Sequence, residues 1–232
     1  MSRTREALIL ASLTVVTTLI AGAAVATHRA TWVEGISFVT GAVCVWLTVK
    51  ESVWNFPVSL ANVAAFLFVF AKAKLYGDAG LQVVYFILTV IGWYLWLYGG
   101  ENRRELHVSR VPTLEAIVVA VCAVFITCGL TLYLRHVDGA VPFWDALTTA
   151  ISLSAQWLLN RKYLENWWCW IVADVIYIPL YAYKSLYLTS TLYGVFLCMA
   201  VMGLLAWRDT WWRRRVNPLI GEPRGFEVVV PS

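Results

Sequence analysis

Long apolar stretches constrain the fold of this chain more than any other feature. Its 232 residues are 60% hydrophobic and only 14% charged, whereas soluble domains carry about 25% charged residues. A helix that crosses the hydrocarbon core of a bilayer needs about 20 predominantly apolar residues. We therefore predict an all-α polytopic membrane protein, with spans near 6–27, 32–49, 54–71, 78–98, 112–134, 141–159, 166–183 and 187–207.

The positions of Lys and Arg predict the orientation of these helices. If the C-terminus is cytoplasmic and the helices alternate, the N-terminus is cytoplasmic as well, and most of the 18 Lys and Arg lie on that side. Cytoplasmic loops of membrane proteins carry this excess of positive charge. We expect a multi-pass protein of the plasma (inner) membrane, and nothing in the net charge of +4 indicates nucleic acid. The opposite side holds only Arg29, Lys72, Lys74, Arg135 and Lys184.

The first apolar stretch allows two interpretations. Its basic start, its apolar run and the small residues Ala24, Val25 and Ala26 are also found in signal peptides. The apolar run, however, is longer than the 7 to 15 residues typical of a signal peptide. This favours a retained transmembrane helix.

Motifs for common enzymatic chemistry are absent from the sequence. The five cysteines are isolated in apolar stretches without a C-x-x-C pair, and the three histidines lie in connections. This leaves no paired helical histidines for haem and no cysteine cluster for a metal. A Walker A sequence is absent as well. We predict a protein that is not an enzyme and that uses neither a metal nor a cofactor.

The chain repeats itself at an offset of 111 to 112 residues. "WLTVKESVWNFPVSLANVAAF" matches "WLLNRKYLENWWCWIVADVIYI", and "AKLYGDAGLQVVYF" matches "KSLYLTSTLYGVFL". Each copy contains three predicted helices, and the extra helix between the copies gives both the same orientation. This predicts a 3+1+3 bundle of parallel repeats, as in transporters with a central substrate path. The predicted units are an N-terminal helix (1–30), the first repeat (31–100), a linker with one helix (101–138), the second repeat (139–210) and a cytoplasmic basic tail (211–232).

One face of the stretch 166–183 carries polar and aromatic side chains. At 100° per residue, a single sector of the helical wheel contains Asn166, Trp167, Trp170, Asp174 and Tyr177. A charged residue inside a membrane helix is costly and commonly marks a substrate path. The face is therefore a candidate binding surface.

The first repeat has a similar face at the corresponding helix. At an offset of 112 residues it carries Trp54, Asn55 and Asn62. We expect the two faces to meet at the axis between the repeats and to line one shared cavity. Neighbouring helices add further amide and hydroxyl groups to this candidate site, namely Gln82, Tyr85, Gln156 and Asn160.

Other roles are open to the same residues. Tryptophans near helix ends commonly form an interfacial belt, which is the role we expect for Trp168 and an alternative for Trp167 and Trp170. Asn62 and Asp174 lie well inside their predicted spans, where hydrogen bonding between helices is the alternative to ligand binding.

The spaced motifs resemble a known transporter family. "WNFP" with the following Asn and "KLYGDAGLQVVYF", and then "NWWCW" with "KSLYLTSTLYG", are similar to the two signature regions of PnuC-type nicotinamide riboside transporters. The resemblance covers about residues 32 to 209. It implies a SWEET-like 3+1+3 fold, commonly a homotrimer, and facilitated diffusion of nicotinamide riboside that a cytoplasmic kinase keeps directed inward.

The candidate residues suit this substrate, which is a pyridinium cation with a carboxamide and a ribose. Trp167 and Trp170 are able to stack on the ring, Asp174 to offset its charge, and amide groups to bind the polar substituents. The face has no Arg or Lys to receive a phosphate, which predicts that nucleotides are rejected. Because Asp174 is the only central ionisable residue, we expect uniport rather than ion-coupled transport.

Two other functions are alternatives. The wider family carries thiamine or riboflavin, so the chain is alternatively a carrier for one of these vitamins or a SWEET-like sugar carrier. A second alternative is a membrane scaffold without transport activity, in which the polar face only holds helices together.

Overall fold

The computed structural model describes residues 32–72, 76–138, 141–183 and 187–216, and five isolated helical positions between 12 and 22. The predicted first span, 6–27, otherwise lies outside the described residues. In the described ranges the chain is helical, which confirms the all-α prediction. The helices are α2 (Trp32–Val49), α3 (Asn55–Lys72), α4 (Tyr76–Tyr98), the short 3-10 helix η1 (Glu101–Arg103), α5 (Thr113–His136), α6 (Pro142–Asn160), α7 (Asn166–Tyr183) and α8 (Tyr187–Val216).

The helix bounds follow the apolar stretches of the sequence. By length and composition alone, the segments Ala79–Tyr98, Thr113–His136 and Ser190–Val216 are able to cross a membrane. The last helix, α8, continues beyond the predicted end at residue 207. Its extension carries an ion pair between Asp209 and Arg213, one turn apart, and three arginines in its last turn. Such a pair and positive charge at a helix C-terminus both stabilise helix.

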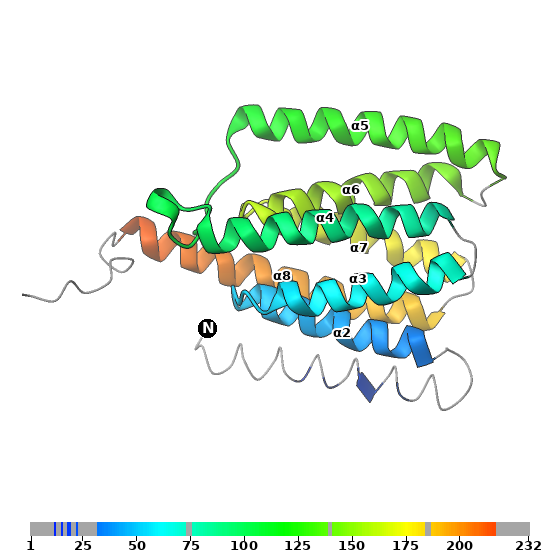
Figure 1. The fold of residues 1–232 in the computed structure, drawn as a ribbon, viewed down its shortest axis with the longest axis horizontal. Helices are drawn as coiled ribbons and strands as arrows, with labels where there is room; N and C mark the ends of the chain where they lie inside the picture. Colours follow the sequence, from blue (N-terminus) through cyan, green and yellow to red (C-terminus); the bar gives the residue numbers. More distant parts are fainter. Residues whose placement is uncertain are drawn as a thin grey trace, which may run out of the picture.

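Six of the helices form a closed bundle (Figure 1). Within each half, consecutive helices pack together, so that α3 contacts α2 and α4, and α7 contacts α6 and α8. The two halves meet through α2 against α8 and through α4 against α6. Helix α5 lies at the edge of the bundle and packs on α6.

Two buried tryptophans join the halves at the centre of the bundle. Trp96 of α4 and Trp207 of α8 are almost completely buried, and their ring centroids are 5.9 Å apart. The indole N–H of Trp96 donates to the Leu159 carbonyl at 3.0 Å, and that of Trp207 donates to the Thr48 carbonyl at 3.1 Å. Both donors and both acceptors are related by the same offset of 111 positions.

A second aromatic pair follows the same offset. Phe56 packs edge-on against Trp96, with centroids 5.1 Å apart, and Trp167 packs edge-on against Trp207, with centroids 5.4 Å apart. The Trp167 ring lies so close to Gly203 that a Cβ at this glycine would come within 2.4 Å of it. A glycine is required at this position by packing.

This contact gives the first testable prediction. Gly203→Ala should lower the free energy of unfolding by about 1 to 3 kcal/mol, because a methyl group forced into a close-packed site displaces its neighbours. The matched control is Gly194→Ala in the same helix, where a Cβ meets nothing within 4 Å. Thermal melts in detergent measure both variants. Equal melting temperatures in the two variants would contradict the packing described above.

A buried ion pair joins the α2–α3 turn to the α6–α7 turn. The Lys162 ammonium lies 3.3 Å from the Glu51 carboxylate, donates to the Leu106 carbonyl and lies 4.4 Å from the centroid of the Trp96 ring. Burial lowers the pKa of Lys162, and the Glu51 charge opposes this shift. Glu51 and Lys162 both have a φ of 54°, in the left-handed region that few non-glycine residues adopt. They too lie 111 positions apart.

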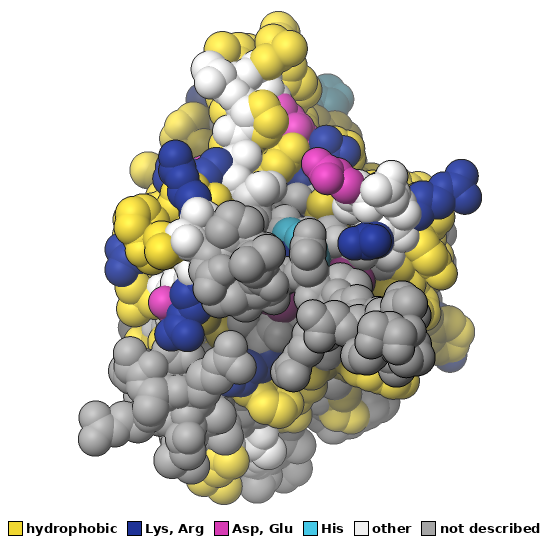
Figure 2. Space-filling view, turned by 90° about the vertical axis from the view of Figure 1, so that its left-hand side faces the viewer, with side chains coloured by type: hydrophobic (Ala, Val, Ile, Leu, Met, Phe, Trp, Pro, Cys, Tyr) yellow, Lys and Arg dark blue, Asp and Glu magenta, His cyan; other side chains and the backbone are white. Residues whose placement is uncertain are grey.

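The end of the bundle that contains these turns is rich in basic side chains. Figure 2 shows Lys and Arg distributed around this end. The segment before α5 is fastened here, because the Glu165 carboxylate accepts from the Val111 N–H and pairs with Arg110. Glu115 of α5 accepts from Trp157 and Tyr163. These contacts attach α5 to α6 and to the α6–α7 turn.

Candidate functional site

A cavity of about 250 Å³ lies between the two halves of the bundle. It is bounded by α2, α3, α6, α7 and α8. Its lining residues are Gly41, Cys44, Val45, Thr48, Ser59, Gln156, Leu159, Trp167, Trp170, Asp174, Tyr193, Phe196 and Ala200.

Helix α7 contributes three of the predicted site residues to this cavity. Trp167, Trp170 and Asp174 all line it, and they lie at spacings of three and four residues, which keeps them on one helix face. Trp168 is 56% exposed on the outer side of the bundle. From α6, the predicted residue Gln156 also lines the cavity.

The cavity contains polar groups that the protein itself leaves without partners. Asp174 is 5% exposed, and no hydrogen bond or ion pair holds its carboxyl group among the described residues. The buried indole N–H of Trp167 also has no acceptor in the described part of the chain. The cavity lining includes no Lys or Arg. These features provide a carboxylate, a donor and aromatic surfaces for a ligand without a negative charge.

Other predicted polar residues are engaged in hydrogen bonds between helices. Asn62 of α3 donates to the Thr40 hydroxyl of α2. Tyr85 of α4 is hydrogen-bonded to Ser152 of α6. These side chains do not line the cavity, and they join neighbouring helices.

The amide of Asn160 connects the cavity to α4. It accepts from Gln156 at 3.1 Å and donates to the Leu88 carbonyl at 2.7 Å. Asn160 is completely buried, whereas Gln156 lines the cavity. The contact therefore positions the Gln156 side chain from behind.

Four further predicted residues lie outside the cavity lining. Asn55 and Asn166 begin α3 and α7 and are buried, and the Asn166 amide donates to the Tyr163 carbonyl at 2.6 Å. Gln82 is half-buried. Trp54 is 71% exposed, so the structure separates it from the aromatic residues of α7.

An aromatic cluster closes the cavity on the side of the C-terminal half of α7. Tyr177, which the sequence singles out, packs against Tyr193 with centroids 4.6 Å apart. Tyr181 stacks on Tyr193 at 5.1 Å, and Phe196 packs edge-on against it at 5.8 Å. Sequence reasoning missed Tyr193 and Phe196, although their spacing of three residues places both on one face of α8.

Helices α2 and α3 provide small polar groups that the sequence did not indicate. The Ser59 hydroxyl donates to the Cys44 sulfur at 3.4 Å, and the Thr48 hydroxyl donates to the Cys44 carbonyl. All three residues line the cavity. In an apolar sequence such single residues are typical of helix packing, so no pattern distinguishes them. No group of three metal-ligating side chains occurs within the described ranges.

Comparisons with known proteins identify the family. A sequence model described as "Nicotinamide mononucleotide transporter" matches residues 31–209. The chain belongs to this family. Its members are membrane transporters rather than enzymes, which agrees with the sequence-based prediction, and the resemblance to PnuC-type transporters is confirmed. We therefore describe the chain as a multi-pass membrane transporter.

Relatives within the family carry names of two substrates. The nicotinamide riboside transporter PnuC of Escherichia coli is 29% identical over 202 residues, covering 76% of this chain and 84% of the relative. The protein of the same name from Neisseria mucosa is 28% identical over 188 residues, covering 76% and 72%. The riboflavin/roseoflavin transporter RibM of Streptomyces davaonensis is 24% identical over 188 residues, covering 79% and 86%.

A solved structure shares the fold. The crystal structure of the vitamin B3 transporter PnuC matches this family member with a TM-score of 0.67 and 24% identity. The match covers 92% of this chain and 94% of the solved one. The likeness establishes a common helical architecture.

Proposed function

We propose that this transporter carries nicotinamide riboside across the plasma (inner) membrane by facilitated diffusion. The observation that supports this most strongly is the pairing, in one cavity, of the Trp170 ring with the unpartnered carboxyl group of Asp174. A pyridinium ring is flat and cationic, so it gains both from an aromatic face and from a nearby negative charge. Curated relatives from Escherichia coli and Neisseria mucosa are named as transporters of this compound.

The same cavity disfavours the phosphorylated compound that gives the family its description. A phosphate needs cationic or multiple N–H donors, and the lining offers a carboxylate but no Lys or Arg. Nicotinamide mononucleotide would bring its phosphate near Asp174 without compensation. We expect the riboside to be transported and the nucleotide to be rejected.

The ribose hydroxyls and the carboxamide need hydrogen-bonding partners. Gln156, Ser59 and the Trp167 N–H supply them along the cavity wall. The other predicted residues, which lie behind the wall or between helices, would fix the shape of the site. Asn62, Gln82, Tyr85, Asn160 and Tyr177 belong to this supporting group.

The transport cycle we propose uses two parallel three-helix repeats joined by α5. The common offset of 111 residues between Trp96 and Trp207, and between their acceptors, supports this 3+1+3 arrangement. Rocking of one repeat against the other would open the cavity to each side in turn. The N-terminal helix would be an addition to this core, and the C-terminus would face the cytoplasm.

The assembly and the driving force are part of the same proposal. We expect a homotrimer with one path in each protomer, and a cytoplasmic kinase that phosphorylates the riboside and keeps its gradient inward. Asp174 is the only Asp or Glu in the cavity lining and would be occupied by the substrate cation. This leaves no second carboxylate there for a coupled proton or sodium ion.

Flux into proteoliposomes tests this proposal. Purified protein should equilibrate labelled nicotinamide riboside across the membrane without an ion gradient and should not concentrate it. The nucleotide should neither enter nor compete. Accumulation above the outside concentration under an imposed ion gradient, with no kinase present, would contradict uniport.

The two neighbouring tryptophans provide a matched test of the site. Trp170→Ala removes a ring from the cavity wall, and a desolvated cation–π contact is worth about 1 to 2 kcal/mol. The affinity for nicotinamide riboside should therefore fall roughly 5- to 30-fold. Trp168→Ala, which removes an exposed ring, should leave affinity nearly unchanged. Calorimetry measures binding and thermal melts measure folding, and equal binding losses with unchanged melts would contradict the one-sided site.

A further inference from the structure

A second cavity opens at the basic end of the bundle. Its volume is about 480 Å³, which is within the range of small-molecule sites. It shares no residue with the cavity between the repeats. Its lining residues come from the segment before α5, the α6–α7 turn and α8, and they are Arg110, Leu164, Leu205, Arg208, Asp209, Trp211 and Trp212.

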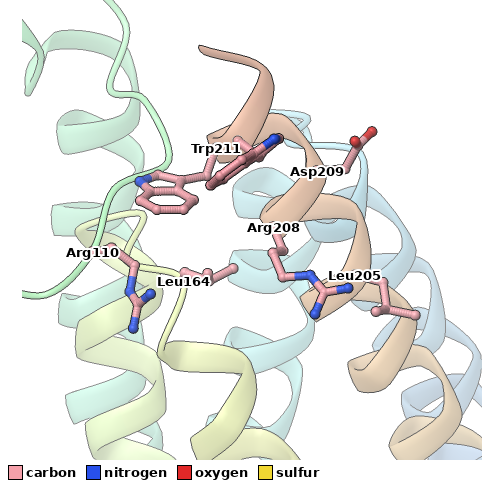
Figure 3. A pocket seen from close by; sticks show the side chains of 7 residues that line it. Arg110, Leu164, Leu205, Arg208, Asp209 and Trp211 are labelled. Atoms are coloured by element: carbon pink, nitrogen blue, oxygen red, sulfur yellow. The ribbon is translucent and has the colours of Figure 1, made fainter. Parts of the chain in front are cut away.

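Two guanidinium groups flank this cavity. In Figure 3, Arg110 and Arg208 lie on either side of Leu164. Arg110 pairs with Glu165, and its guanidinium carbon lies 5.7 Å from the Trp211 ring centroid. Arg208 has no acidic partner among the described residues. The cavity therefore contains one positive charge that the protein does not neutralise.

The acid in the cavity lining does not change this balance. Asp209 is paired with Arg213 at 2.9 Å, and two further arginines follow in the same helical turn. One of them, Arg215, lies 5.3 Å from the Trp211 ring centroid. An anion that approaches the cavity therefore meets a net positive field.

The position of the cavity corresponds to the interface of a membrane. Trp207 hydrogen-bonds to Thr48, next to the end of α2 at Val49, so the turn that follows Trp207 lies level with the helix ends. A helix of 30 residues, such as α8, is about 45 Å long, which exceeds the hydrocarbon core of roughly 30 Å. Trp211 and Trp212 suit the headgroup level, where tryptophan is enriched.

We propose that this cavity binds the headgroup of an anionic phospholipid. The phosphate would lie between Arg208 and Arg110, since guanidinium groups bind phosphate through paired N–H donors. Leu164 and Leu205 would contact the glycerol and the upper acyl chains, and Trp211 would cover the headgroup. A soluble anion would use the arginines but not the apolar part of the wall, which is why we commit to a lipid.

Lipid-dependent stability of the full chain tests this proposal. The protein is purified in a neutral detergent and titrated with phosphatidylglycerol or phosphatidylcholine, and melting is followed together with lipid retention in native mass spectrometry. Phosphatidylglycerol should bind more tightly and raise the melting temperature more than phosphatidylcholine. Arg208→Gln should weaken phosphatidylglycerol binding about fivefold, which corresponds to roughly 1 kcal/mol for one arginine near a lipid surface.

Three controls make the outcome decisive. Arg104→Gln removes the same charge from an exposed position at the same end of the bundle and should keep the preference for phosphatidylglycerol. Arg208→Lys keeps the charge and should retain part of it. Inorganic phosphate without lipid should not stabilise the protein. The proposal is overturned if Arg208→Gln keeps the full preference, if the two lipids act equally, or if phosphate alone reproduces the effect.

Discussion

A Glu51→Gln variant is expected to melt roughly 6 to 12 °C below the parent protein. The substitution leaves the Lys162 ammonium, which is 6% exposed, without the carboxylate that lies 3.3 Å away. Removing one partner of a buried ion pair costs about 3 to 5 kcal/mol, and we take the lower value because the Glu51 side chain is 19% exposed. In a protein of this size, 1 kcal/mol shifts the melting temperature by about 2 to 4 °C.

The size of this effect depends on burial, and an exposed pair provides the control. Arg213 and Asp209 form an ion pair in which both side chains are more than half exposed. Such pairs contribute under about 1 kcal/mol, so Arg213→Gln should shift melting by less than Glu51→Gln. Adding Lys162→Met to Glu51→Gln should recover part of the loss, because it removes the uncompensated charge. Equal melts for Glu51→Gln and the parent would contradict the structural role of the pair.

An Asp174→Asn variant should bind nicotinamide riboside about 10- to 100-fold more weakly than the parent protein. A charge pair at contact is worth about 4 kcal/mol at an effective dielectric constant of 20, and the desolvation of both ions takes back part of this. A net loss of roughly 1.4 to 2.7 kcal/mol corresponds to the stated range. The carboxamide keeps the shape of the side chain, so the loss reports the charge.

The neutral, reduced form of the riboside separates charge from shape. Calorimetry with this compound should give similar affinities for Asp174→Asn and the parent, whereas the cationic form should discriminate strongly between them. Asp138→Asn is the matched control, since it removes the same charge at an exposed position whose left-handed backbone tolerates asparagine. Equal losses for the cationic and the neutral ligand would argue against an electrostatic role for Asp174.

The sequence predicted the helices well, because apolar length is what a bilayer requires. Stretches 32–49 and 166–183 coincide with α2 and α7 at both ends. The end of α8 was missed because residues 208–216 are stabilised by ion pairing and the helix dipole, which leave no apolar signal. The helical wheel also predicted the α7 face, since three of its residues line the cavity.

The remaining part of the site depends on how helices are placed next to one another. An offset of 112 aligned Trp54 with Asn166, whereas the paired contacts of the structure follow 111, so that Asn55 and Asn166 correspond and both are buried. A difference of one residue turns a helix face by 100°, which separates Trp54 from the bundle interior. Tyr193 and Phe196 could not be assigned because an aromatic face toward lipid and one toward a cavity have the same sequence pattern.

Binding of nicotinamide riboside by the purified protein tests the central claim most directly. Calorimetry in detergent would compare the riboside with nicotinamide mononucleotide, riboflavin, thiamine and glucose under identical conditions. We predict that the riboside binds, that the nucleotide binds at least about tenfold more weakly, and that the other three compounds do not bind. A folded protein that binds riboflavin or the nucleotide as tightly as the riboside, or that does not bind the riboside, would contradict the account.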